Sequence, residues 1–160
     1  MSIDRIELRV GQALRARKWR LATAESCTGG LIGHHLTAVS GSSDYYVGGV
    51  IAYANDVKTR VLGVAAEALE RFGAVSEPVA RAMARQAAQR SGADVAVSIT
   101  GIAGPGGGTD SKPVGLVYIA VVIDGQCEVK ECRFPPSNRH WVRLRSALTA
   151  LNWVRLRLQD

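Results

Sequence analysis

The chain has 160 residues, of which 47% are hydrophobic and 21% are charged, and its formal net charge is +6. This length suits one domain whose core needs neither disulfides nor a structural metal, and the composition excludes a disordered protein. No apolar run is long enough to span a membrane and no signal-peptide pattern opens the chain, so we expect a cytoplasmic protein. The three cysteines, Cys27, Cys127 and Cys132, have no metal-ligand spacing, so we expect free thiols and no metal.

Hydrophobic spacing predicts the elements of the first half of the chain. Ser2 is the expected N-cap of the first helix, and the serine and glycines of residues 26–30 form a turn between a strand and a helix. Gly48-Gly49 predicts a bulge or a close backbone approach within a strand. The predicted elements are a helix over 3–17, a strand over 19–24, a helix over 31–38, a strand over 45–54 and short helices over 55–63 and 65–72.

Turn and cap signals divide the second half of the chain. Ser76-Glu77-Pro78 opens a helix with a hydroxyl cap, an acid and a proline, and Ser91-Gly92 ends it. Asp124-Gly125 is a hairpin signal, and the apolar alternation slips between Val129 and Cys132, which predicts a bulge or an exposed edge strand. The remaining predicted elements are strands over 95–99, 115–123 and 126–134, a loop over 100–113 and a helix over 141–158.

The order of these elements indicates the fold class. Helices interspersed with buried strands and a single hairpin are typical of an α/β fold with a mixed β-sheet. No internal repeat, low-complexity tract or linker divides the sequence. We therefore predict one three-layer α/β/α domain over residues 1–160.

Two segments carry side chains suited to nucleophilic catalysis. The strand-to-helix turn over 24–30 displays Ser26 beside helix N-terminal amides, which can hold an anion or an oxyanion, although a capping serine with turn glycines is the simpler interpretation of this segment alone. The segment over 53–58 places Tyr53 at a strand end and Lys58 in the next helical turn. A desolvated neutral lysine can deprotonate a serine, with the tyrosine positioning the proton, but a surface lysine beside a half-buried tyrosine would give the same pattern.

A third segment, over 100–109 with Lys112 shortly after it, is rich in glycine and threonine. Glycines allow several backbone N–H groups to approach one phosphate, which makes a concave anion site. The spacing matches neither a Walker A loop nor a dinucleotide-binding turn, because the loop connects two strands. A flexible surface hairpin is the alternative, and we favour the anion site.

Taken together and in this order, the specialised segments resemble the CinA C-terminal domain family. The chain's 160 residues leave no room for the N-terminal domain of longer members, so we expect it to be similar to the stand-alone, PncC-type form, a nicotinamide-nucleotide amidase. The resemblance implies hydrolysis of the carboxamide of nicotinamide mononucleotide to nicotinate mononucleotide and ammonia, without a metal or cofactor. It is carried by residues 24–31, 53–58, 73–76, 100–105 and 112–115.

The resemblance also implies the roles of individual residues. Ser26, Tyr53 and Lys58 act together in catalysis, while the glycine loop and the start of the last helix hold the nucleotide; Ser137-Asn138-Arg139 stands where many members carry Gly-Asp-Arg. We expect Lys58 to take the Ser26 proton directly or through Tyr53, amides around 28–30 to stabilise the oxyanion, and Lys112 or Arg139 to attract the phosphate. The expected substrate-binding residues are Thr28, Gly29, Gly30, Thr100, Gly101, Gly104, Gly106, Gly107 and Arg139.

Several alternatives remain open from the sequence. Cys27 is a rival nucleophile, ranked below Ser26 because its side chain should point into the fold. Basic residues gather in 1–20 and 133–160, which would suit a non-catalytic nucleotide- or nucleic-acid-binding module, but solvated faces of two amphipathic helices explain them better. Another phosphorylated carboxamide is a further candidate substrate. We expect no membrane or nucleic-acid partner and a homo-oligomer, with a dimer favoured.

Overall fold

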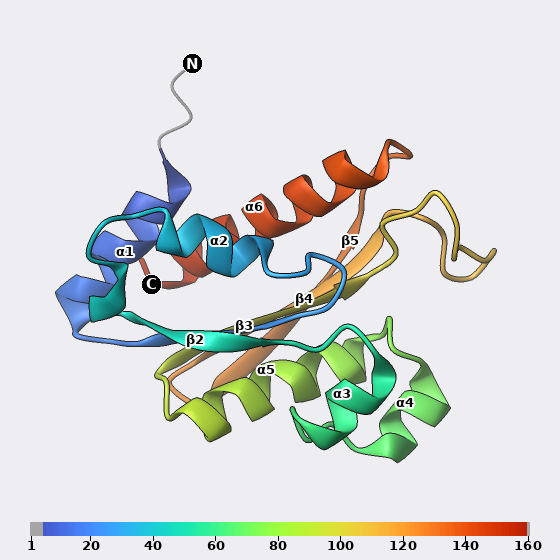
Figure 1. Ribbon diagram of the computed structural model, residues 1–160, viewed down its shortest axis with the longest axis horizontal. Helices are drawn as coiled ribbons and strands as arrows, with labels where there is room; N and C mark the ends of the chain where they lie inside the picture. The colour runs from blue at the N-terminus through green and yellow to red at the C-terminus, as the bar shows by residue number, and fades with distance from the viewer. Residues whose placement is uncertain (1–4, 160) are drawn as a thin grey trace.

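Five strands form one mixed sheet in the computed structural model, which describes residues 5–159 (Figure 1). The strand order is β2-β1-β3-β4-β5; β1 pairs in parallel with β2 and β3, and β4 pairs antiparallel with β3 and β5. The strands are β1 (Leu21–Glu25), β2 (Tyr46–Ile51), β3 (Val95–Gly101), β4 (Leu116–Ile123) and β5 (Gln126–Arg133). The helices are α1 (Ile6–Arg17), α2 (Leu31–Thr37), α3 (Asn55–Arg60), α4 (Ala66–Phe72), α5 (Glu77–Ser91) and α6 (Arg139–Arg157), with a 3-10 turn at Ser42–Asp44.

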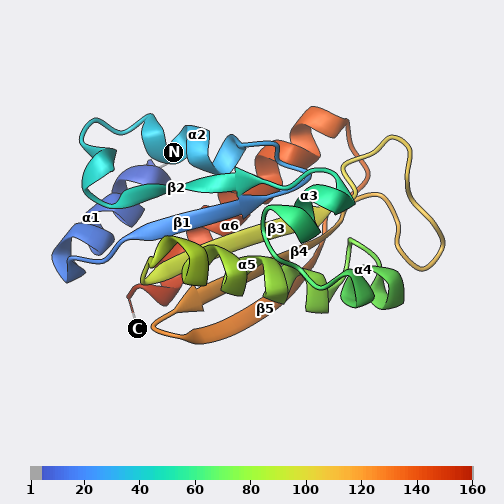
Figure 2. The ribbon, with the colours of Figure 1, turned by 60° about the horizontal axis from the view of Figure 1, so that its bottom comes forward.

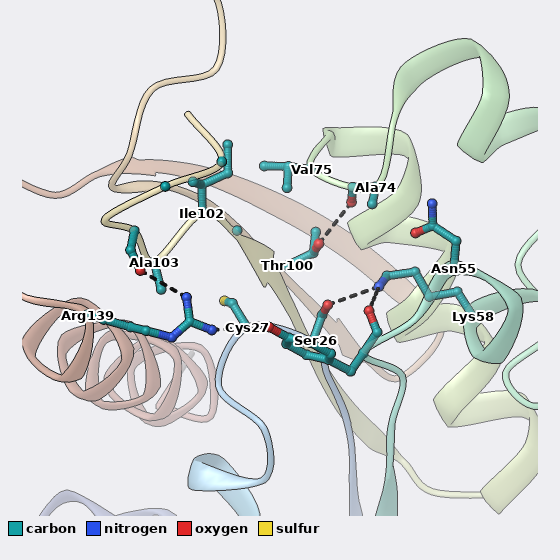
Figure 3. A pocket seen from close by; sticks show the side chains of 15 residues that line it. Ser26, Cys27, Asn55, Lys58, Ala74, Val75, Thr100, Ile102, Ala103 and Arg139 are labelled. Carbon is teal, nitrogen blue, oxygen red and sulfur yellow. Dashed lines mark hydrogen bonds between the residues drawn. The ribbon is translucent and has the colours of Figure 1, made fainter. Parts of the chain in front are cut away.

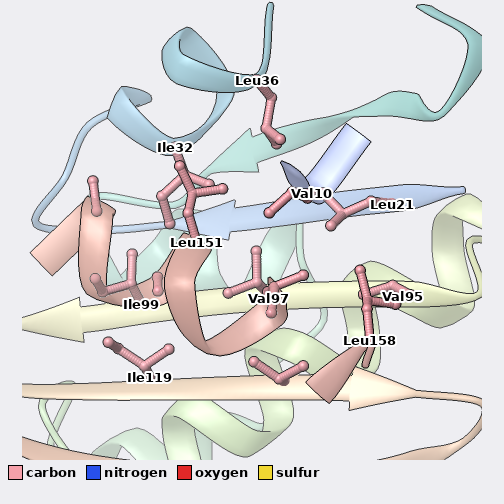
Figure 4. Packing of buried hydrophobic residues seen from close by; sticks show 14 of the residues in the cluster. Val10, Leu21, Ile32, Leu36, Val95, Val97, Ile99, Ile119, Leu151 and Leu158 are labelled. Carbon is pink, nitrogen blue, oxygen red and sulfur yellow. The ribbon is translucent and has the colours of Figure 1, made fainter. Parts of the chain in front are cut away.

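Helices cover both faces of the sheet, as the predicted α/β/α layering requires. α1, α2 and α6 lie on one face, and α5 lies on the other with α3 and α4 beside it (Figures 1 and 2). The first face has a core in which Leu21, Val97 and Leu151 are fully buried (Figure 4), and the second has a core around Met83 and Ala96. Because β1 and β3 are covered on both sides, their sequences are nearly continuous runs of small and apolar residues.

The predicted helices form, but their capping differs in detail. The expected N-cap Ser2 lies outside the described residues. Ser76 does precede α5, but the prediction that its hydroxyl caps the helix is wrong: the hydroxyl donates to the Gly73 carbonyl at 2.8 Å. α6 begins two residues earlier than predicted because the Asn138 side chain accepts the Trp141 amide at 2.8 Å, which satisfies one of the free helix N–H groups.

The two edge strands, β2 and β5, explain the two irregular patterns in the sequence. In β2 the pairing with β1 shifts by one residue at Val47, directly before Gly48, whose φ is +130°. A Cβ on Gly49 would clash with the Thr23 side chain, so both the bulge and the close approach are confirmed. β5 pairs with β4 in unbroken register and is exposed along most of its length, so the slipped alternation marks an edge strand without a bulge.

The connections place a crevice at the carboxyl ends of the parallel strands. The chain passes from β1 to β2 through α2 on one face, and from β2 to β3 through α3, α4 and α5 on the other. β1 therefore lies between β2 and β3, and the connections that lead to these two strands cross opposite faces of the sheet. The loops that follow β1 and β3 diverge. Ligands of open α/β sheets bind at this kind of switch point.

Candidate active site

A cavity of about 340 Å³ lies at this switch point. Its walls come from the turn after β1, the loop and first turn after β2, the end of β3 with the glycine loop, and the start of α6 (Figure 3). Segments far apart in the sequence therefore meet there. The lining residues are Ser26, Cys27, Tyr53, Asn55, Lys58, Ala74, Val75, Thr100, Gly101, Ile102, Ala103, Gly104, Gly106, Gly107 and Arg139.

Ser26 and Lys58 are in direct contact on the wall of this cavity. The Lys58 Nζ lies 2.9 Å from the Ser26 Oγ, and the lysine side chain, on α3, is 1% exposed (Figure 3). The same nitrogen donates to the Ala52 carbonyl at 2.7 Å and to the Tyr53 carbonyl at 3.1 Å. The amine thus faces two groups that can only accept a hydrogen bond and one hydroxyl that can either accept or donate.

Burial favours the neutral form of this lysine, which is aligned on the serine. Burial lowers the pKa of the Lys58 amine below its ordinary value, and the nearby Cys27 thiol has a smaller, opposite effect. A neutral amine has two N–H groups and one lone pair. When the two carbonyls of Ala52 and Tyr53 take the N–H groups, the lone pair is left for the Ser26 hydroxyl. The site can therefore move the hydroxyl proton to the amine in one step.

Glu25, the last residue of β1, fixes the turn that carries Ser26. Its buried carboxylate accepts the Thr28 hydroxyl at 2.6 Å, the Ile32 amide at 2.9 Å and the Gly33 amide at 3.1 Å. The carboxylate thereby occupies the first free amides of α2, and the Ser26 amide is tied to the Ile99 carbonyl at 3.0 Å. This structural role of Glu25 was not predicted from the sequence, where Glu25 is only one residue of a motif.

Thr28, Gly29 and Gly30 do not reach the cavity wall, contrary to the binding role expected for them. The Thr28 side chain is fully buried against Glu25, and the Gly29 amide donates to the Ser26 carbonyl at 3.1 Å. Gly29 and Gly30 have φ values of +59° and +104°, so their part is to allow the sharp turn. The Gly29 amide is not free for an oxyanion.

Cys27 also lines the cavity but is poorly suited to act as the nucleophile. It is 6% exposed and packs in the core between the sheet and α6. Burial raises the pKa of its thiol to about 12, which keeps the reactive thiolate scarce at neutral pH. The predicted inward direction of the Cys27 side chain is confirmed.

Tyr53 and Arg139 meet at the mouth of the cavity. The Tyr53 side chain is 61% exposed, and its hydroxyl accepts a hydrogen bond from the Arg139 Nη2 at 3.1 Å. The Arg139 Nη1 donates to the Gly104 carbonyl at 2.9 Å, so the arginine links α6 to the glycine loop (Figure 3). Within the described residues, the Tyr53 hydroxyl contacts neither Ser26 nor Lys58, so the direct proton path between them fits better than a path through the phenol.

The glycine loop forms the opposite wall. The Thr100 hydroxyl donates to the Ala74 carbonyl at 2.8 Å, which ties the end of β3 to the segment before α5 (Figure 3). In the part of the chain that the structure describes, the amides of Gly106 and Gly107 donate to no other group. Thr100, Gly101 and Gly104 join them on the wall. Amides without an internal acceptor are available to an anionic ligand.

Lys112 is not part of this wall. Its Nζ donates to the Phe72 carbonyl at the end of α4 at 2.6 Å. The expected attraction of phosphate by Lys112 is therefore not supported, and Arg139 is the arginine on the wall. Asn55, which was not predicted from the sequence, also lines the cavity, with its polar side chain beside Lys58 (Figure 3). Its position in the sequence, within the segment from Tyr53 to Lys58, could have indicated that it belongs to the site.

No group of three or more histidine, cysteine, aspartate or glutamate side chains lies close enough to hold a metal ion within residues 5–159. Among the described helices, none combines the length and the apolar character needed to cross a bilayer.

Comparison with known proteins gives consistent matches. Residues 3–158 match the family described as the CinA C-terminal domain. A CinA-like protein of Synechococcus sp. is 54% identical over 92% of this chain, and one of Geobacter sulfurreducens is 50% identical over 96%. The chain spans 36% and 37% of the length of these two relatives.

Solved structures agree with this assignment. The competence/damage inducible protein CihA from Agrobacterium tumefaciens superposes with a TM-score of 0.92 at 42% identity, and each chain is covered completely. The competence damage-inducible protein A from Klebsiella pneumoniae superposes with a TM-score of 0.93 at 37% identity, over 97% of this chain and 96% of that one.

Proposed function

Because the chain belongs to the CinA C-terminal domain family, and because its cavity holds a serine bonded to a buried lysine, we propose that it is an amidase that hydrolyses the carboxamide of nicotinamide mononucleotide. The products are nicotinate mononucleotide and ammonia. The single observation that carries this proposal is the 2.9 Å contact between the Lys58 Nζ and the Ser26 Oγ at a switch-point cavity.

In the first half of the reaction, the neutral Lys58 amine takes the proton of Ser26 as the Oγ attacks the carboxamide carbon. The resulting oxyanion is stabilised by backbone amides, an effect worth about 3–4 kcal/mol per donor. The lysine, now an ammonium, returns the proton to the leaving nitrogen. Ammonia departs and the acyl group remains as an ester on Ser26.

In the second half, Lys58 removes a proton from water as the water oxygen attacks this ester. That proton passes from Lys58 to the Ser26 oxygen, and the product leaves as the carboxylic acid, which releases the second water proton to solvent. The carbonyls of Ala52 and Tyr53 hold the amine in place through both halves. No atom changes oxidation state in either half of the reaction.

The charge and shape of the cavity support a phosphorylated substrate. The amides of Gly106 and Gly107 are free to bind phosphate oxygens, and Arg139 brings a positive charge to the same wall. The Arg139 guanidinium is held only by two neutral groups, the Gly104 carbonyl and the Tyr53 hydroxyl. An anion would therefore be its first charged partner in the site.

The experiment is an ammonia-release assay with wild-type protein and a panel of pyridine compounds. We expect turnover of nicotinamide mononucleotide and much slower turnover of free nicotinamide, which lacks the phosphate, and of the dinucleotide, whose phosphate carries a further nucleoside. Equal rates for all three compounds would contradict the role of the glycine loop. A faster rate with another phosphorylated carboxamide would assign that compound as the substrate.

A second candidate, a nucleic-acid-binding module without turnover, is favoured by one observation. α1 and α6 pack side by side on one face of the sheet and carry many of the arginines (Figure 1). Binding of duplex DNA that weakens steeply with added salt, in a protein that releases no ammonia, would support it. Salt-insensitive or absent DNA binding would exclude it.

A further inference from the structure

Arg143, on the second turn of α6, contacts the backbone directly after the nucleophile. Its Nε donates to the Cys27 carbonyl at 3.0 Å and its Nη2 donates to the Thr28 carbonyl at 2.9 Å. Arg143 does not line the cavity, and no carboxylate within residues 5–159 forms a salt bridge with it. Its charge is therefore directed at two peptide oxygens of the turn that begins at Ser26.

The hydrogen bonds of this turn are divided unevenly between carbonyls and amides. All three of its carbonyls have donors: Ser26 receives the Gly29 amide, and Cys27 and Thr28 receive Arg143. In contrast, the amides of Cys27 and Thr28 donate to no oxygen in the described part of the chain. Buried amides without an acceptor are rare in folded proteins, because each costs free energy.

Peptide geometry connects the two observations. In a planar trans peptide, the N–H of one residue points opposite to the C=O of the residue before it. Arg143 holds the Cys27 carbonyl and so fixes the peptide unit after Cys27, whose Thr28 N–H points away from α6. The Ser26 carbonyl is held by the Gly29 amide, so the peptide unit before Cys27 is fixed within the same turn, and its N–H, that of Cys27, points opposite to the Ser26 carbonyl.

We propose that Arg143 is a positioning residue for the amidase reaction: it fixes the turn that follows Ser26 so that the free amide of Cys27, a residue that lines the cavity, faces the oxyanion formed at that serine. This inference rests on the proposed function. It replaces the Gly29 amide, which is already occupied, with the amide of Cys27. Arg143 itself does not touch the substrate and acts through the turn.

The side chain has to be an arginine for this role. The guanidinium presents two N–H groups in a fixed fork, which matches two successive carbonyls, whereas a lysine can offer only a point charge. The turn is also built tightly against it, because a Cβ placed on Gly29 would lie 3.2 Å from the Arg143 Nη2.

The test measures kcat and KM for ammonia release by Arg143→Ala and Arg143→Lys. Arg145→Ala is the matched control, because Arg145 is an exposed arginine on the same helix whose contact is with the Trp141 ring. We expect Arg143→Ala to lower kcat by about tenfold or more with KM nearly unchanged, since removal of an oxyanion donor costs about 100-fold or more. Arg143→Lys should fall between Arg143→Ala and the wild type, and the control should match the wild type.

A second readout separates positioning from general damage to the fold. In an aldehyde analogue of the substrate, the carboxamide is replaced by a group that forms a tetrahedral adduct with serine. We expect Arg143→Lys to bind this analogue more weakly by the same factor as its loss of kcat, and to bind nicotinate mononucleotide as the wild type does. Equal loss of affinity for both compounds would overturn the inference.

The outcomes distinguish this inference from the proposed function. A wild type that releases no ammonia overturns both. An active wild type whose kcat survives both Arg143 substitutions overturns only the role of Arg143. A shift of the acidic limb of the pH profile in Arg143→Lys would also overturn it, because that result would place the effect on Lys58.

Discussion

Replacing Lys58 with methionine should remove catalysis while leaving a folded protein. Methionine has a similar length, and it can occupy the buried space of a side chain that is 1% exposed. The variant keeps Ser26 but loses the group that accepts its proton. Loss of a general base costs about 10²–10⁴-fold in rate, and we expect kcat to fall at least that far because the serine hydroxyl is a weak nucleophile without a base.

The same substitution has an effect on stability whose size changes with pH. Lys58→Met leaves the carbonyls of Ala52 and Tyr53 without their donor, and a buried orphan acceptor costs about 1–3 kcal/mol. In the wild type, the pKa of Lys58 is lowered in the folded state relative to 10.5 in the unfolded chain. Between these two pKa values the unfolded chain binds one more proton, so wild-type stability rises with pH by about 1.4 kcal/mol per pH unit.

The assay is urea unfolding of the wild type and Lys58→Met over the alkaline range, together with ammonia release. The wild type should gain free energy of unfolding relative to the variant as pH rises toward 10.5, and the difference should be constant below the folded pKa of Lys58. Lys130→Met, on the edge strand β5, is the control and should show neither effect. A free-energy difference that does not vary with pH would refute the buried, neutral amine.

Four further outcomes follow from the site. The kcat/KM for amide hydrolysis should rise with pH through the lowered pKa of Lys58, because the neutral amine is the base; a profile that stays flat from acid pH up to 10.5 would contradict this. Cys27→Ala should keep kcat within about threefold and thiol reagents should react slowly, given the raised pKa of that thiol; thiol-directed inactivation that spares an active Cys27→Ser protein would instead identify the sulfur as the nucleophile. Glu25→Gln should lower the free energy of unfolding by about 1–3 kcal/mol in urea titration, because the new amide group faces backbone donors; unchanged stability would refute its capping role. Arg139→Ala should raise KM for the mononucleotide about tenfold and leave the rate with the unphosphorylated riboside unchanged, whereas equal effects on both would exclude a phosphate contact.

The strands, and the motifs that contain Ser26 and Lys58, were predictable because both depend on short-range signals. β1 and β3 could be identified from runs of small and apolar residues, and the crevice follows from parallel strands ending at one edge. Ser26 and Lys58 follow two neighbouring strands of this sheet. Side-chain chemistry named both residues as candidates, and the family resemblance joined them; the 2.9 Å contact bears out that pairing.

The contacts that the sequence did not predict involve side chains whose partners lie elsewhere in the fold. The Glu25 carboxylate accepts hydrogen bonds from the first amides of α2, so these amides are not free to bind the anion that was expected at the start of that helix. Lys112 extends to the end of α4, and the Ser76 hydroxyl donates to the Gly73 carbonyl in place of the expected cap of α5. Local spacing carries no information about such competition. The expected homo-oligomer and cytoplasmic location remain predictions.

The most direct measurement of the central claim compares ammonia release from nicotinamide mononucleotide by the wild type and by Ser26→Ala at equal protein concentration. The Ser26→Ala change removes one oxygen next to an intact Lys58, and the turn, held by Glu25 and Arg143, should keep its fold. The account predicts steady release by the wild type and a loss of about 10³-fold or more in the variant. Wild-type turnover by Ser26→Ala would contradict it.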